Sequence, residues 1–188
     1  ALSKALTISQ TNVGPVVIAD QSDNAGAGAP GDSTFALGWL LNHNISNAAI
    51  AILYDPQVVK IAMAAGVGTE LMVRLGGKMG ITSGVPLDLP VKVTATKKNY
   101  VHLFPQEQGV PARIPIGDTV ALQCSGVDII VSSNRSQCFS PSIFYDFNIL
   151  PDEKNLIIVK STQHFYQAFK EISPFIIYMS APGSTPPD

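Results

Sequence analysis

The chain has 188 residues, of which 46% are apolar and only 14% are charged, and its formal net charge is −2. This length suits one domain with a buried core, and the absence of a basic block argues against nucleic acid or an anionic membrane as a partner. No apolar run reaches the roughly 18 residues that a membrane-spanning helix needs. Cys124 and Cys138 are too few for a disulfide framework or a thiolate zinc site, so we expect two unpaired, structural thiols.

The first third of the chain predicts strands that alternate with helices. Residues 1–14 have weak periodicity and are interpreted as a lead-in or linker remnant. The following apolar runs indicate, in order, strand 16–20, helix 35–41, strand 48–54 and helix 57–65. Asp32 or Ser33 is the expected cap of the first helix, because a short polar side chain can accept its free backbone N–H groups. This alternation is the βαβ pattern, which favours parallel strands.

The remainder predicts a β-rich middle followed by a return to strand and helix. Short β-favouring runs separated by Gly, Pro and Asn indicate strands 69–75, 87–96, 100–104, 119–124 and 127–132. Later runs indicate strand 155–159, helix 162–170 and strand 175–179, and 181–188 is expected to be a disordered tail. We therefore expect one α/β domain over residues 15–180. Its mixed sheet would have a parallel βαβ core flanked by helices and an antiparallel β-rich middle segment.

The segment between the first strand and the first helix is the main candidate for a functional site. It combines acids, an amide and glycines, namely Asp20, Asp23, Asn24, Gly26, Gly28, Gly31 and Asp32. The three glycines match the dinucleotide-binding pattern G-x-G-x-x-G. However, five residues separate Asp20 from Gly26, and several acids would surround the pyrophosphate, which like charges strongly disfavour. A nucleotide-binding domain is therefore the least favoured interpretation.

Two interpretations of this loop stay open on the residues alone. In the first, the carboxylates and Asn24 bind a cation or an ammonium group, or carry out acid–base chemistry on a substrate. In the second, Asp32 caps a helix, Asp23 and Asn24 form turns, and the glycines only supply positive φ angles. The residue types fit both interpretations equally well.

Other candidate groups lie near the C-terminus of the chain. Lys160 and Ser161 follow a predicted strand, at the position where open parallel sheets bind ligands. The alternative is that Ser161 or Thr162 caps the next helix while Lys160 is solvated. Because Asp20, Asp55 and Lys160 all end predicted parallel strands, we expect one edge of the sheet to collect them.

The three histidines and the standard hydrolase motifs give little further signal. His43, His102 and His164 lack the spacing of a zinc site and are expected to be surface or hydrogen-bonded residues. The chain has no G-x-S-x-G motif, so a serine hydrolase is not favoured.

The order of several motifs resembles the C-terminal domain of the microcystinase C (MlrC-like) metallopeptidase family. The matching motifs are DQSDNAGAGAPGDST from Asp20, Asp55-Pro56, AGVG from Ala65, LGGK from Leu75, Pro86-Leu87, Val159-Lys160-Ser161 and His164-Phe165. They span residues 14–183, nearly the whole chain. In the loop, Ala25 and Ala27 depart from the family pattern, which is richer in Gly and Pro.

The resemblance implies a function that this chain would share with a missing N-terminal domain. Family proteins would carry zinc ligands in that domain and hydrolyse amide bonds of small or cyclic peptides, in the bacterial cytoplasm. This chain would bind no cofactor itself and would be inactive alone. It would supply Asp20, Asp23, Asn24, Gly26, Gly28, Asp32, Lys160 and Ser161 as residues that contact substrate or support those that do, with no catalytic residue assigned. The alternative is a non-catalytic structural or oligomerisation module, in which an apolar face binds another domain or forms a homo-oligomer.

Overall fold

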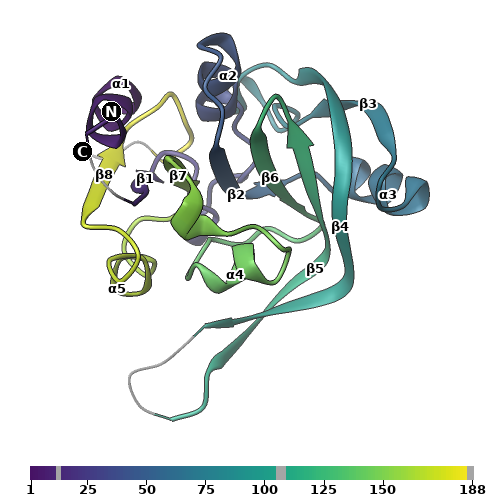
Figure 1. The fold of residues 1–188 in the computed structure, drawn as a ribbon. Helices are drawn as coiled ribbons and strands as arrows, with labels where there is room; N and C mark the ends of the chain where they lie inside the picture. The colour runs from purple at the N-terminus through teal and green to yellow at the C-terminus, as the bar shows by residue number, and fades with distance from the viewer. Residues whose placement is uncertain (12–13, 105–108, 186–188) are drawn as a thin grey trace.

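One mixed sheet of eight strands organises the computed structural model, which describes residues 1–11, 14–104 and 109–185 (Figure 1). The strand order is β3-β4-β5-β6-β2-β7-β1-β8. The strands are β1 (Val16–Asp20), β2 (Ala48–Tyr54), β3 (Glu70–Leu75), β4 (Leu87–Phe104), β5 (Ala112–Cys124), β6 (Val127–Ser132), β7 (Leu156–Val159) and β8 (Phe175–Met179). The α/β fold with a mixed sheet is therefore confirmed.

The parallel half of the sheet consists of β6, β2, β7, β1 and β8, each paired in parallel with its neighbour. Every residue of β1, β6 and β7 is buried, which explains why β7 is a continuous apolar run and why β1 is apolar up to Asp20. Alternate residues contribute to two hydrophobic clusters, one on each face. Ile18 belongs to the first cluster and Val17 to the second.

Helices cover both faces of this half. The first cluster includes side chains of α1 (Leu2–Ser9), α2 (Phe35–Asn42) and α3 (Pro56–Ala65). The second includes side chains of α4 (Ser142–Tyr145) and α5 (Tyr166–Phe169). None of the helices in the described part of the chain is long and apolar enough to cross a bilayer.

The antiparallel half is formed by β3, β4, β5 and β6. β4 and β5 extend beyond the rest of the molecule as a long arm (Figure 1). The prediction of two strands at 87–96 and 100–104 was wrong, because β4 runs through the polar Lys97-Lys98-Asn99 segment with a register shift between Lys97 and Tyr100. The shift accommodates Asn99, whose φ is 47°.

Several helix predictions also need correction. α2 begins after Thr34 and has no side-chain cap, so neither Asp32 nor Ser33 caps it. The predicted helix 162–170 is reduced to α5, which follows Phe165 without a side-chain cap, so Ser161 and Thr162 do not cap it. α1 lies within the expected lead-in, and α4 was not predicted. A third short element, the 3-10 helix η1 (Ala25–Ala27), lies in the loop after β1.

The chain ends close to the loop that follows β1. Within the segment expected to be a tail, Ala181 N–H donates to Ser22 Oγ over 3.0 Å and Thr185 N–H donates to Ser22 O over 3.1 Å. Residues 12–13 of the lead-in and 186–188 of the tail lie outside the described residues. Cys124 and Cys138 are both buried and unpaired, as expected.

Candidate functional site at the carboxyl edge of the parallel strands

The polar residues singled out in the sequence gather at the carboxyl ends of neighbouring parallel strands. Asp20 is the last residue of β1, Asp55 directly follows β2 and Lys160 directly follows β7. Since β7 lies between β1 and β2 in the sheet, these three residues share one edge. The prediction that one edge collects them is confirmed, and the alternative of a solvated Lys160 is wrong because its side chain is fully buried.

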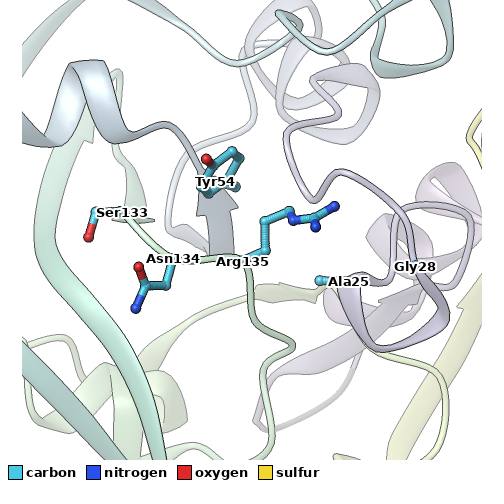
Figure 2. A pocket seen from close by; sticks show the side chains of 6 residues that line it. All are labelled: Ala25, Gly28, Tyr54, Ser133, Asn134 and Arg135. Atoms are coloured by element: carbon cyan, nitrogen blue, oxygen red, sulfur yellow. The ribbon is translucent and has the colours of Figure 1, made fainter.

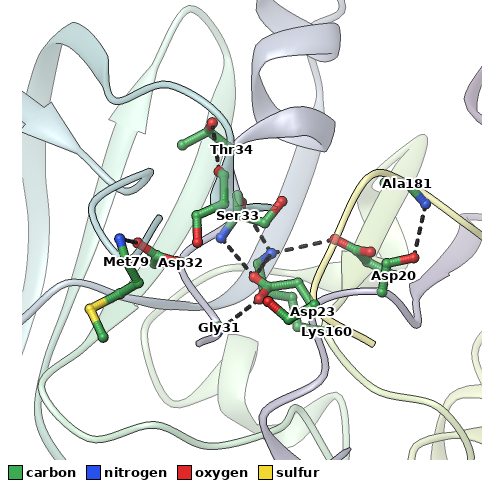
Figure 3. A network of polar contacts seen from close by, with 12 residues as sticks. Asp20, Asp23, Gly31, Asp32, Ser33, Thr34, Met79, Lys160 and Ala181 are labelled. Carbon is green, nitrogen blue, oxygen red and sulfur yellow. Dashed lines mark hydrogen bonds and ion pairs between the residues drawn. The ribbon is translucent and has the colours of Figure 1, made fainter. Parts of the chain in front are cut away.

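Lys160 is the centre of a buried hydrogen-bond network (Figure 3). Its ammonium group donates to Asp23 Oδ2 over 2.7 Å, to Ser33 O over 3.1 Å and to Asp20 Oδ2 over 3.4 Å. Asp23 also accepts the Gly31 and Ser33 N–H groups over 2.8 and 2.7 Å. Lys160 and Asp23 therefore fix both ends of the loop to β7.

Electrostatics explain how this network tolerates burial. Burial alone would lower the pKa of Lys160, but the carboxylates of Asp20 and Asp23 outweigh it, so this pKa lies above its ordinary value. Lys160 thus stays charged and neutralises part of the negative charge of the two acids. Asp20 and Asp23 are almost completely buried, so bulk solvent does not reach them.

Asp32 and Asp55 hold a second loop, which connects β3 to β4. Asp32 Oδ2 accepts the N–H groups of Lys78 and Met79 over 2.7 and 2.9 Å. Asp55 caps α3 by accepting Val58 N–H, and it also accepts Gly76 N–H over 2.9 Å. Lys78 Nζ lies 2.6 Å from Asp55 Oδ2. Asp32 and Asp55 therefore hold the backbone of the β3–β4 loop in place, and Asp55 also holds the start of α3.

The remaining predicted residues join the glycine-rich loop to its neighbours. Asn24 accepts Gly26 N–H and donates to Thr162 Oγ1 over 2.8 Å. Ser161 Oγ donates to Gln137 Oε1 over 3.1 Å. A Cβ on Gly26 would lie 2.2 Å from Gln137 Nε2, so a larger residue there would displace the Gln137 amide from its present position.

The carboxylates of this edge do not fit a metal ion. Nowhere in the described ranges is there a group of three or more His, Cys, Asp and Glu side chains that could hold one. The position between Asp20 and Asp23 that a cation would take already holds the Lys160 ammonium group. Asp20 Oδ1 and Asp32 Oδ1 lack a hydrogen-bond partner among the described residues, but they belong to different networks.

A pocket of about 410 Å³ opens beside the glycine-rich loop (Figure 2). It is lined by Ala25, Gly28, Tyr54, Ser133, Asn134 and Arg135. The loop forms one wall, and the segment that follows β6 forms the other. Of the residues predicted for the site, only Gly28 lines this pocket.

The opposite wall of the pocket was not predicted from the sequence. Residues 133–135 belong to no motif or predicted element, and Tyr54 was predicted only as the end of strand 48–54. The available signal was position, because Tyr54 ends β2 and residues 133–135 follow β6, at the same edge as Asp20 and Lys160. Arg135, a cation in the segment after β6, would have been the residue to select.

A different polar network surrounds the buried His102, which lies close to the end of β4 in the β4–β5 arm. Tyr100 donates to Asp146 Oδ2 over 2.6 Å, so its oxygen can accept from His102 Nδ1, 3.3 Å away. His102 Nε2 then accepts from Ser140 Oγ, 3.4 Å away, and Ser142 Oγ lies 2.7 Å from Ser140 Oγ. Burial lowers the pKa of His102 to about 4, with Asp146 opposing the shift, so the ring is neutral at pH 7.

The other two histidines are exposed and lie apart from this network. The His43 ring stacks on Trp39 with 4.1 Å between ring centroids, and the His164 ring lies 6.1 Å from that of Phe139. The expectation of surface or hydrogen-bonded histidines is met by all three.

Comparison with known proteins finds relatives that share this fold. The family model described as MlrC C-terminus matches residues 18–188. Microcystinase C from a Sphingomonas species is 34% identical over 167 residues, which are 89% of this chain and 32% of that protein.

A crystal structure gives a further match. It is that of a protein from Mesorhizobium sp. BNC1, provisionally classed as a metallopeptidase, with a TM-score of 0.85 over 99% of this chain and 37% of that chain. At 24% identity, this likeness shows a shared fold. The chain thus spans about a third of the length of the relatives it matches.

Proposed function

This chain belongs to the MlrC C-terminus family, and from this membership we propose that it is the C-terminal part of a zinc-dependent peptidase or amide hydrolase. The substrates are small or cyclic peptides. The metal ligands lie in an N-terminal domain, which would account for the two thirds of the relatives' length that this chain does not match. The active site forms between that domain and the carboxyl edge of the parallel strands.

The observation that carries this proposal is the pocket between the glycine-rich loop and residues 133–135. It lies where open parallel sheets bind ligands, beyond the carboxyl ends of the strands. Its lining combines an aromatic ring, a hydroxyl, an amide and a guanidinium group, which suits a peptide with both apolar and polar groups.

In this proposal the residues predicted from the sequence form two groups, one that supports the glycine-rich loop and one that belongs to the loop itself. Asp20, Asp23, Asp32, Lys160 and Ser161 hold the loop and its surroundings in place from below. Gly28 lines the pocket that faces the substrate, and Asn24 fixes the shape of the loop by accepting the Gly26 N–H group. This chain supplies binding and orientation, and no catalytic residue is assigned to it.

Two alternatives predict different behaviour. In a structural or oligomerisation module, the pocket would have no effect on turnover. A nucleotide-binding domain is disfavoured because the Gly31 and Ser33 N–H groups, which a phosphate would need, already bind the Asp23 carboxylate.

The test is to fill the pocket in the full-length protein. Ala25→Trp places a large ring in the pocket, whereas Ala27→Trp places the same ring on the exposed side of η1, outside the lining. We expect Ala25→Trp to lower kcat/KM for peptide hydrolysis by roughly 10-fold or more, because substrate loses its place next to the loop. Ala27→Trp should leave it unchanged.

Thermal unfolding of both variants serves as the folding control. Equal activity of the two folded variants and the unmutated protein would refute an active-site role for this pocket and favour the structural module.

A further inference from the structure

Among the residues that the structure describes, Arg135 is the only charged one that lines the pocket beside the glycine-rich loop. Its side chain extends from the segment after β6 toward the loop that carries Ala25 and Gly28 (Figure 2). It is exposed, and none of the ion pairs formed within the described ranges includes it. The guanidinium group is therefore available to a ligand.

The acids nearest to this pocket in the chain are not available as partners for Arg135. Asp23 is used by two backbone N–H groups and Lys160, and Asp55 by two N–H groups and Lys78. Neither lines the pocket. An arginine that faces a pocket without an acid in its lining leaves a local excess of positive charge, although the whole chain has a net charge of −2.

The backbone that carries Arg135 is held in place. Ser133 N–H donates to Asp118 O and Asn134 N–H donates to Ile116 O, both on β5, over 2.9 and 3.1 Å. Ser132 Oγ donates to Asn134 O over 2.8 Å. Arg135 therefore projects from a segment tied to the sheet, which reduces the entropy lost when it binds a ligand.

We propose that Arg135 binds a carboxylate of the substrate peptide and makes the pocket selective for acidic peptides. The planar guanidinium group matches a carboxylate with two parallel hydrogen bonds. The side chains of Ser133, Asn134 and Tyr54 provide further hydrogen-bonding groups in the same lining. This inference rests on the proposed function and adds the substrate class to it.

The test uses pairs of peptides that differ only in one carboxylate. One pair exchanges Glu for Gln inside a blocked tetrapeptide, and the other exchanges a free C-terminus for an amide. Initial rates are measured with the full-length protein, its Arg135→Gln variant and, as a matched control, its Arg113→Gln variant on the exposed part of β5.

The expected result concerns KM. The unmutated protein and Arg113→Gln should have a KM roughly 10- to 100-fold lower for the acidic member of at least one pair, the size of a lost charge-assisted hydrogen bond. Arg135→Gln should abolish that difference by raising the KM of the acidic peptide, with kcat little changed.

Two outcomes separate this inference from the function on which it rests. If Ala25→Trp impairs hydrolysis but Arg135→Gln leaves the discrimination intact, the pocket is used and the role of Arg135 is refuted. If the unmutated protein does not prefer the acidic member of either pair, or hydrolyses neither member, the inference is also refuted. If Ala25→Trp has no effect either, the proposed function fails as well.

Discussion

Two buried polar networks lie in different halves of this sheet, and they tolerate burial in opposite ways. Around Lys160, in the parallel half, charged groups are kept charged by opposite charges and by backbone N–H groups. Around His102, in the antiparallel arm, burial keeps the ring neutral, and the ring takes part in a chain of hydrogen bonds that leads through Tyr100 to the exposed Asp146 carboxylate. Burying a group does not by itself reveal its charge state; its partners do.

This difference decides how each network should respond to perturbation. The charged network should respond strongly to removal of a partner, because the remaining charges cannot reach water. The His102 network should respond to pH, because protonation of the ring would place a positive charge in a buried position. Three predictions follow this contrast, in order of decreasing effect.

Removal of the Lys160 charge should have the largest effect. Lys160→Met leaves Asp20 and Asp23 buried without their cation, so we expect the free energy of unfolding to fall by about 3–5 kcal/mol. Denaturant unfolding measures this, and Lys60→Met on the exposed side of α3 is the control, with an expected change within about 0.5 kcal/mol. A loss below about 1 kcal/mol at Lys160 would contradict its role as the cation that compensates Asp20 and Asp23.

Acidification should destabilise the protein through His102, by an amount up to about 3 kcal/mol. The pKa in the folded protein, about 4, lies below the ordinary value of 6.5. Below pH 6.5 the unfolded chain binds a proton that the folded protein refuses, so stability is fully present above about pH 6.5 and is lost toward pH 4.

The measurement is the midpoint of thermal unfolding between pH 4 and 8, compared with that of His102→Gln. The difference between the two curves isolates this ring from carboxylates that titrate in the same range. Parallel curves would show that His102 takes up protons as easily in the folded protein as in the unfolded chain.

A smaller effect is expected at Asp55, because its cation is partly exposed. Asp55→Ala removes the cap of α3 and the bond to Gly76 N–H, which should cost about 1–2 kcal/mol. The Lys78 side chain is 30% exposed and can be solvated when its partner is lost. Denaturant unfolding of this variant and of Lys160→Met compares the two losses in free energy of unfolding. An equal or larger loss for Asp55→Ala would contradict the predicted order.

The parallel half of the fold was predictable because its strands are buried on both faces. A strand such as β7 shows this as an uninterrupted apolar run between polar residues. The antiparallel arm was predicted less well, because Lys97, Lys98 and Asn99 interrupt the apolar pattern while the backbone continues through them with a shifted register. Local composition does not reveal a strand that projects from the domain.

The candidate site was predictable as a location but not as a set of contacts. The ends of parallel strands placed Asp20, Asp55 and Lys160 together correctly. The partner of Asp32 could not be foreseen, because Lys78 and Met79 approach from a loop 46 and 47 residues away. The same holds for Lys160, whose partner Asp23 lies 137 residues earlier.

That long separation in sequence has a consequence during synthesis of the protein on the ribosome. A ribosome releases the chain from its N-terminus, so Asp23 and Ser33 emerge long before Lys160, their partner 137 and 127 residues later. Until Lys160 is synthesised, Asp23 has only the nearby Gly31 and Ser33 N–H groups as partners in this network. A nascent chain that stops before β7 therefore lacks the cation that joins Asp23 and Ser33.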